Sequence, residues 1–300
     1  MWFKHLSVYR LPAGLDLDSV ALENKLASQP LQACGSMDKE SRGWVSPRSD
    51  ERLVHVLNRQ VLIALGEEQK LLPASIVNQF AQDKAEQIEA QQGYKLGRKQ
   101  MRELKEQITD ELLPRAFARR RTTWAWIDPV NGWLVVDAAT PAKAEALLEM
   151  LGKCADDLPV KTLHTEHSPV AAMSDWLLSG EAPAGFSIDQ DLELRAADDG
   201  RATVRYVRHT LDGEEVGAHI GAGKQPTRLG LTWNDRIAFM LDEQLRLKRL
   251  AFLDILKEES EQAENAEEAF DLDFMLMTGE VAKLLADLVA ALGGEKAAAI

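Results

Sequence analysis

The chain has 300 residues and a formal net charge of −13, with 45% hydrophobic and 28% charged residues. This composition excludes a disordered chain and suits a globular protein of about two or three domains. The only two cysteines, Cys34 and Cys154, are far apart in the sequence, which argues against a disulfide framework or a thiolate metal site. Because the sequence has no long apolar run and no leader pattern, we expect a cytoplasmic protein with no membrane partner.

The N-terminal region is predicted to combine strands with one short helix. Residues 3–11 alternate between apolar and polar side chains, as a half-buried strand does, and a short helix is expected at 18–27. Residues 53–57 and 61–65 have the pattern of two paired strands. This region therefore predicts the first part of a sheet.

Two long helices are predicted next. The first spans 73–92, begins with proline and has no further Gly or Pro. The second starts near Arg98 and ends near Leu113, because Pro114 restricts the residue before it. A Gly-containing segment at 93–97 joins them, so we expect a helical hairpin that projects about 25–30 Å as a finger.

The second helix carries side chains of three kinds at helical spacing. Its apolar stripe consists of Met101, Leu104, Ile108 and Leu112. A basic stripe about a quarter turn away consists of Lys95, Arg98, Arg102 and Lys105. We expect the far side of the helix to carry Glu103, Glu106 and Asp110. The apolar stripe should pack against protein, which leaves the basic stripe accessible.

A second basic cluster follows the helix and is expected in a turn. It consists of Arg115, Arg119, Arg120 and Arg121, with Phe117 among them. Residues 95–121 hold nine basic and four acidic side chains, in a chain that is acidic as a whole. Two interpretations stay open: a solvated helix face, or a ridge that faces nucleic-acid phosphates, which requires clustered rather than total positive charge.

The pattern then returns to β structure. Strands are predicted at 122–127 and 133–137 around an Asn-Gly pair at 131–132, which is a strong hairpin signal. A helix at 141–154 and a strand near 160–163 should follow. This grouping resembles the N-terminal region in element order, so we expect two α+β halves of one sheet-based body.

Three tryptophans lie on this predicted hairpin, at Trp124, Trp126 and Trp133. Exposed aromatic rings could stack on nucleic-acid bases. Alternation across a hairpin favours core packing instead, and we adopt that interpretation.

The C-terminal region contains strands, a change of charge and a final helix. Strands are predicted at 203–209 and, as a hairpin, at 237–241 and 245–250. Nine acidic residues and no basic residue lie between 258 and 280, and an apolar helix is expected at 278–292. The fold class is therefore predicted to be α+β.

We expect three domains. Residues 1–72 and 122–175 should form a discontinuous central body, residues 73–121 the finger, and residues 176–300 a C-terminal base. The boundary between body and base should fall between Ser168 and Pro183, ahead of a stretch rich in Pro, Gly and Asp.

Catalytic and metal-binding motifs are not convincing. Residues 218–225 imitate a phosphate-binding loop, but Gln225 stands where Ser or Thr should bind Mg²⁺, and Pro226 prevents the following helix. His164 and His167 bracket a glutamate without a third metal ligand. We therefore predict a protein that is not an enzyme and needs no cofactor or metal.

Six blocks of sequence, in order from end to end, resemble the bacterial recombination-associated RdgC family. They are WFKHLSVYRL at 2–11, ACGS at 33–36 with GWVSP after it, LLPRAF at 112–117, WIDPVNG at 126–132, LTWNDRIAFML at 231–241 and LMTGEVAKLL at 276–285. The resemblance implies a non-enzymatic DNA-binding protein that forms ring-shaped homodimers around double-stranded DNA. It also implies that such proteins restrain RecA-mediated strand exchange by occupying DNA, and hence a nucleoid-associated location.

The resemblance also implies roles for particular residues. Phe117 matches a family phenylalanine at one subunit contact, and Arg208 with His209 matches a basic-polar pair near the other. His209 departs from the expected glutamine, so this part of the match is weaker.

Segregated charge on the sequence is consistent with a ring that is positive inside and negative outside. The predicted DNA-binding residues are Lys95, Arg98, Lys99, Arg102, Lys105, Arg115, Arg119, Arg120, Arg121, Arg201, Arg205, Arg208, Lys224 and Arg228. Without a groove-reading motif, binding should be independent of sequence. The alternative function is a protein-interaction scaffold with an acidic tail and no direct role on DNA.

Overall fold

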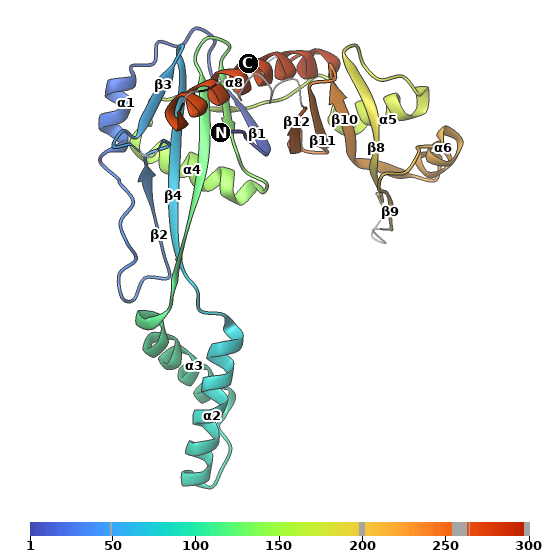
Figure 1. The fold of residues 1–300 in the computed structure, drawn as a ribbon. Coiled ribbons are helices and arrows are strands. Elements are labelled where there is room, and N and C mark those ends of the chain that lie inside the picture. The colour runs from blue at the N-terminus through green and yellow to red at the C-terminus, as the bar shows by residue number, and fades with distance from the viewer. Residues whose placement is uncertain (49, 198–201, 254–262, 264, 297–300) are drawn as a thin grey trace.

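A computed structural model describes residues 1–48, 50–197, 202–253, 263 and 265–296. Within these residues the fold is α+β, as predicted, and is built on a twelve-stranded sheet whose strands pair antiparallel. The strand order is β2-β4-β5-β6-β1-β12-β11-β10-β8-β9, with β3 beside β4 and β7 beside β1. The chain thus forms an N-terminal half from β1–β7 and a C-terminal half from β8–β12 (Figure 1).

The N-terminal half packs helices on one face of its strands. Its elements are β1 (His5–Arg10), α1 (Ser19–Leu26), β2 (Glu40–Val45), β3 (Val54–Leu57), β4 (Gln60–Lys70), β5 (Ala118–Asp128), β6 (Trp133–Val136), α4 (Pro141–Cys154) and β7 (Lys161–Thr162). Leu22 and Leu26 of α1 share one buried cluster with Leu147 and Leu151 of α4 and with Ile63 of β4. This cluster fixes both helices against the sheet.

The C-terminal half also packs helices on one face of its strands. Its elements are α5 (Pro169–Ser179), β8 (Phe186–Ala196), β9 (Thr203–Tyr206), α6 (Gly213–Gly221), β10 (Lys224–Trp233), β11 (Ile237–Asp242) and β12 (Leu247–Phe252). Helix α8 (Ala266–Ala291) crosses both halves (Figure 1). Its Phe274 and Leu284 belong to one core that also contains Trp126 and Leu231, so a shared hydrophobic core joins the halves.

Strand β1 connects the two halves within the sheet. It pairs with β6 over four residue pairs, whereas it pairs with β12 only at His5–Lys248 and Leu6–Leu247. The continuous sheet is therefore narrow at this seam.

Helices α2 (Ala74–Gln92) and α3 (Arg98–Leu112), followed by the 3₁₀ turn η1 (Leu113–Arg115), form an arm that extends away from the sheet (Figure 1). The two helices pack through their own small cluster of Val77, Ala81, Ala85, Leu104 and Ile108. Gly93 ends α2 with a φ of 77°, a left-handed conformation that glycine adopts without a steric penalty. The elongated strands β4 and β5 lead into and out of this arm.

Several local predictions are confirmed. Helix α4 has the predicted bounds, and the Asn-Gly pair lies in the loop between β5 and β6, where Gly132 has a φ of 73°. A Cβ on Gly132 would lie 2.4 Å from the carbonyl oxygen of Leu11. Glycine is therefore required here both for its positive φ and for this close approach. Trp126 and Trp133 are buried and Trp124 is half-buried, which confirms the core interpretation.

Other local predictions are wrong. Strands β2, β8 and β10 and helices α5 and α6 were not predicted. Helix α8 begins twelve residues earlier than expected, at Ala266 rather than Thr278. The predicted strand at 203–209 ends at Tyr206. The buried residues of α8 begin only at Phe274. The polar turns before it have no apolar spacing from which the start of the helix could be predicted.

Candidate nucleic-acid interface

The sheet of the C-terminal half has one covered face and one open face. Leu229, Leu231 and Leu241 point into the core with helices α5 and α8. Because side chains alternate along a strand, their neighbours point the other way, where no helix of the described chain covers them. We call this surface the open face; its strands carry Glu193, Arg195, Arg205, Arg228, Met240, Asp242 and Lys248. Arg246 joins it from the turn between β11 and β12, and His5 and Arg249 lie at its edge toward β1.

A buried glutamate organises three arginines on the open face. The side chain of Glu193 is 5% exposed, and its Oε2 accepts a hydrogen bond from Arg205 Nε at 2.7 Å and lies 3.5 Å from Arg228 Nη1. Its Oε1 accepts from Arg195 Nη2 at 3.1 Å and from Thr227 Oγ1 at 3.0 Å. One carboxylate therefore fixes cations that come from three different strands.

The pKa of Glu193 reflects this arrangement. Burial by itself raises the pKa of this carboxyl, but the hydrogen bond from Thr227 and the charges of Arg228 and Arg205 outweigh burial and lower it. Glu193 is therefore ionised at neutral pH, and the three arginines leave an excess of two positive charges around it.

A buried aspartate has the same role on the next strands. Asp242 is 3% exposed, and its Oδ2 lies 2.7 Å from Arg246 Nη2 and 3.0 Å from Lys248 Nζ. Its Oδ1 accepts hydrogen bonds from the backbone N–H groups of Gln244 and Arg246. Burial raises the pKa of Asp242, but the hydrogen bonds from Arg246 and Lys248 lower it by more. The net shift of this pKa is therefore downward.

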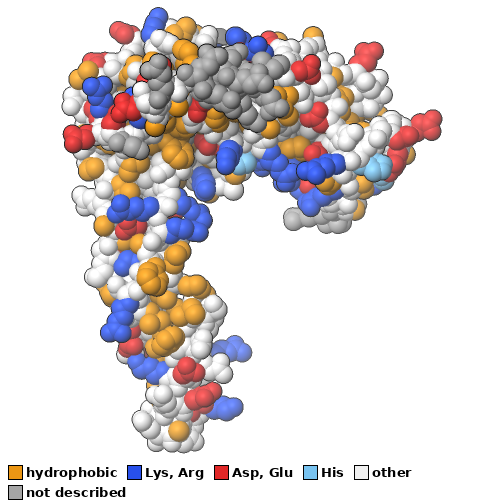
Figure 2. Space-filling model, viewed as in Figure 1, with side chains coloured by type: hydrophobic (Ala, Val, Ile, Leu, Met, Phe, Trp, Pro, Cys, Tyr) orange, Lys and Arg blue, Asp and Glu red, His pale blue; other side chains and the backbone are white. Residues whose placement is uncertain are grey.

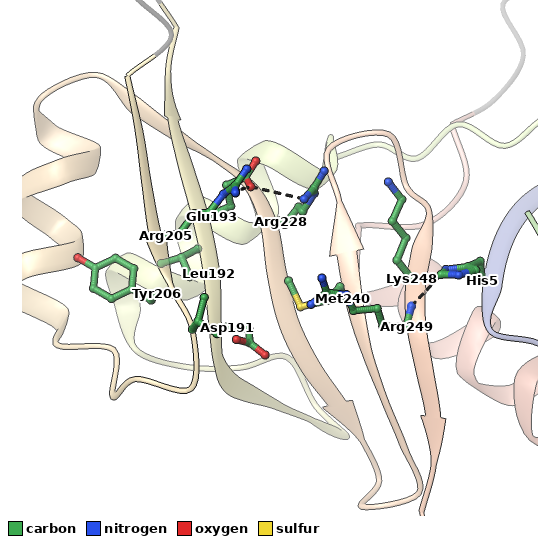
Figure 3. A pocket seen from close by; sticks show the side chains of 11 residues that line it. His5, Asp191, Leu192, Glu193, Arg205, Tyr206, Arg228, Met240, Lys248 and Arg249 are labelled. Carbon is green, nitrogen blue, oxygen red and sulfur yellow. Dashed lines mark hydrogen bonds and ion pairs between the residues drawn. The ribbon is translucent and has the colours of Figure 1, made fainter. Parts of the chain in front are cut away.

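A cavity of about 330 Å³ lies between these two clusters. Figure 3 shows Arg205, Glu193 and Arg228 grouped on one side of it, with Lys248, Arg249 and His5 on the other. The backbone N–H of Arg249 lies 3.4 Å from His5 Nδ1. Thus β1 of the N-terminal half contributes a side chain to the same cavity, although burial lowers the pKa of His5 and it adds no positive charge at neutral pH.

The arm is less basic than its sequence suggests. Helix α3 contains four basic and four acidic residues. Lys99 Nζ lies 3.9 Å from Glu103 Oε1, and Arg102 Nε lies 3.7 Å from Glu106 Oε1. The prediction that the acidic residues occupy a separate far side is therefore wrong, because side chains four positions apart are only about 40° apart on a helix. Lys95, Arg98, Lys99 and Arg102 are all exposed, and Lys105 is half-buried.

The arginines after the arm lie on a strand and not in a turn. Arg119, Arg120 and Arg121 belong to β5, so alternate side chains point to opposite faces. Arg120 Nε lies 2.5 Å from Oε2 of Glu68, whose side chain is 8% exposed and also accepts a hydrogen bond from the N–H of Cys34. The three arginines are exposed, but they do not form one patch. Arg115 is exposed in η1.

The remaining predicted residues are scattered. Arg208 lies in the exposed loop after β9 with a φ of 50°, and its N–H donates to Asp191. The ring of the adjacent His209 lies 6.1 Å from that of Tyr206. Lys224 is half-buried at the start of β10, and Arg201 lies outside the described residues.

Sequence reasoning missed several basic residues of the open face. They are His5, Arg195, Arg246, Lys248 and Arg249. The strands of His5, Lys248 and Arg249 were predicted, but strand β8 of Arg195 was not. The side chains could be assigned to one face only once the pairing of β1 with β12 and of β8 with β10 was known. The available signal was the basic content of residues 246–249 within an acidic chain.

The basic surfaces face a concave side of the molecule. The arm descends from the N-terminal half while the C-terminal half extends sideways, and Figure 2 shows Lys and Arg side chains along the inner side of this bend. Phe117 lies where β5 leaves the arm and is 85% exposed, so it is not part of the core of this chain.

Comparison with known proteins identifies the family. The family described as "Putative exonuclease, RdgC" matches residues 1–295. The chain belongs to the RdgC family. It is 57% identical over 298 residues to the recombination-associated protein RdgC of Herminiimonas arsenicoxydans, with 99% of each chain covered. It is also 53% identical over 297 residues to that of Burkholderia ambifaria, covering 99% of this chain and 97% of the relative.

Two further features concern the described residues of this RdgC-family chain. No helix within that part of the chain has the length and hydropathy to cross a membrane. The same residues contain no group of three or more His, Cys, Asp or Glu side chains that could hold a metal ion, and His164 and His167 are exposed.

Proposed function

We propose that this RdgC-family chain binds double-stranded DNA through its phosphates, without sequence preference and without cleaving it. The observation that carries this proposal is the open face, where two buried carboxylates hold five Arg and Lys side chains, three of which, Arg195, Arg205 and Arg228, are 40–64% exposed. Clustered cations release counterions from DNA, and this contribution to affinity does not depend on base sequence. The overall charge of −13 is no obstacle, since Lys and Arg side chains gather along the inner side of the bend in Figure 2.

We further propose that two chains close into a ring around DNA and that DNA occupancy restrains RecA-mediated strand exchange at the nucleoid. The hook shape in Figure 1 supports this assembly, because two hooks can enclose a space. Phe117 supports it as well, since a phenylalanine exposed to 85% suits an anchor in a partner subunit. The second contact would involve the exposed Arg208–His209 loop.

A nuclease is the second candidate, because the family description includes the word exonuclease. Metal-dependent cleavage of DNA requires carboxylates that are free to bind the ion. The two buried carboxylates on the open face, Glu193 and Asp242, already have arginine or lysine partners, which favours binding over cleavage. Incubation of linear duplex DNA with the protein and Mg²⁺ or Mn²⁺ distinguishes the two functions: we expect intact DNA, and progressive shortening from the ends would establish the nuclease.

The salt dependence of DNA binding tests the main proposal. If a dimer contacts roughly six to ten phosphates, the slope of log affinity against log salt should be about −5 to −9. Random duplexes of equal length should compete equally. A slope of about −1 or a strong preference for one sequence would contradict the proposal, and no binding at low salt would favour a protein-interaction scaffold.

A further inference from the structure

The cavity on the open face has the composition of a binding site for a small phosphate compound. His5, Arg205, Arg228, Lys248 and Arg249 line it, and they come from four strands of the two halves. A cavity of about 330 Å³ lies at the lower end of the range for small-molecule sites. It is too small for a duplex but large enough for one phosphate with its sugar.

The cations around this cavity are held in place before any ligand binds. Arg205 and Arg228 share Glu193, and Lys248 is held by Asp242. Both carboxylates are almost fully buried. Glu193 and Asp191 line the cavity, but its four Arg and Lys side chains outnumber these two carboxylates. Fixing long side chains in advance reduces the entropy that binding would otherwise cost. Arg205 is still 64% exposed, which leaves its guanidinium accessible to an anion.

The rest of the lining also fits a sugar-phosphate and not a bare ion. Leu192, Val207 and Met240 give the cavity an apolar part. Asp191 is the remaining acidic residue, and one of its oxygens accepts the backbone N–H of Arg208. In Figure 3 its carboxylate lies apart from Arg205 and Arg228.

We propose that this cavity is a discrete phosphate-binding pocket that takes one sugar-phosphate unit. The phosphate group is the shared chemistry, and its source is either the backbone of DNA or a free nucleotide. The backbone source rests on the proposed function, whereas the free-nucleotide source does not. The pocket differs from a diffuse basic surface because particular side chains, and not the total charge, determine binding.

Calorimetric titration of the full chain with pyrophosphate and with thymidine 5′-monophosphate tests the pocket. We expect saturable binding of one ligand per chain. Arg205→Ala and Arg249→Ala should each weaken it at least tenfold, because each removes one cation from the lining. Arg102→Ala removes the same charge from the arm and should leave binding unchanged. Thermal melting of each variant verifies that it is folded.

Competition with a short duplex then identifies the source. Displacement of the duplex by pyrophosphate at equal ionic strength supports the pocket as a backbone site. Saturable binding without displacement supports it as a site for free nucleotides. If neither ligand binds, or if Arg102→Ala weakens binding as much as Arg205→Ala, the pocket proposal is overturned even where duplex binding persists. If the full chain binds pyrophosphate but does not bind the duplex, the proposed DNA-binding function is overturned and the pocket proposal stands.

Discussion

The arm and the open face contain similar numbers of basic residues but differ in how their acidic residues are placed. On α3 the acidic side chains are exposed beside the basic ones, with Arg102 and Glu106 73% and 69% exposed. On the open face Glu193 and Asp242 are almost fully buried. The three arginines around Glu193 are 40–64% exposed, whereas Arg246 and Lys248 beside Asp242 are 16% and 19% exposed. Positive charge therefore reaches solvent on the open face and is largely compensated on the arm.

This difference shows that the sequence count of basic residues is a poor measure of an electrostatic site. An exposed ion pair on a helix contributes little stability and cancels charge locally. A buried carboxylate under several cations is itself shielded from a ligand and limits the motion of the cations. Substitutions on each surface distinguish these two arrangements.

The largest effect is expected at the base of the arm. Phe117→Ala should raise the dissociation constant of the dimer by roughly thirty- to a thousand-fold, which corresponds to the loss of an interface anchor of about 2–4 kcal/mol. Analytical ultracentrifugation measures the change. Tyr94→Ala, at an exposed aromatic in the segment between the arm helices, is the matched control and should leave dimerisation intact. A Phe117 variant that stays dimeric would remove this residue from the interface.

Charge removal on the open face should have the next largest effect. Arg205→Ala combined with Arg228→Ala should lower affinity for duplex DNA by roughly ten- to a hundred-fold and reduce the salt slope by about 2, if each arginine contacts one phosphate. Fluorescence anisotropy across a salt series measures both quantities. Glu193 keeps Arg195 and Thr227 as partners in this variant. An unchanged slope would exclude the open face from DNA contact.

The equivalent change on the arm should be weaker. Arg98, Arg102 and Lys105 replaced together by Ala should lower DNA affinity less than about fivefold and flatten the slope by less than about 1, because these cations are already compensated. The helix should stay folded, since alanine is the better helix former. The same anisotropy series provides the comparison, and a loss larger than that of the open-face variant would reverse the assignment of the two surfaces.

Removal of a buried carboxylate should lower stability modestly. Glu193→Gln keeps the shape of the side chain but leaves three arginines without a counter-charge. The loss in folding stability is limited because the three arginines are partly exposed and water solvates them. We expect a melting temperature lower by about 2–5 °C. Glu106→Gln on the arm should leave it unchanged in the same calorimetric scan. Equal melting temperatures for both variants would mean that Glu193 does not organise the open face.

The smallest expected effect concerns acid pH and lies outside both surfaces. Burial lowers the pKa of His55 below its ordinary value of 6.5, although Asp271, with its Oδ1 3.1 Å from His55 Nε2, raises it. As pH falls below 6.5, His55 is therefore protonated in the unfolded chain before it is protonated in the folded protein. The free energy of unfolding should decline until the pH passes the lower pKa of the folded state. In His55→Gln, melting curves between pH 7 and 5 should show a flatter decline. The exposed His164→Gln is the control and should retain the slope.

The sequence by itself determined several local elements of this protein. Helix α4, the two arm helices and the β5–β6 hairpin follow from apolar spacing, proline and the Asn-Gly pair, because these signals act within a few residues. The resemblance of six blocks was enough to indicate the family. Phe117 could be proposed as an interface residue on that basis, but its exposure could not be predicted, since both a core and an interface use the same residue type.

Only the tertiary structure decided which charges face the same way. Because β5 begins at Ala118 and not at Thr122, the side chains of Arg119–Arg121 alternate between its two faces. Arg195, Arg228 and Lys248 lie on one face only because strands that are distant in the sequence pair with one another. A strand shifted by one residue reverses the face of every side chain, so the open face depends on the register and bulges of the whole sheet. The burial of Glu193 and Asp242 beneath their cations has the same origin, and no local pattern of residues encodes it.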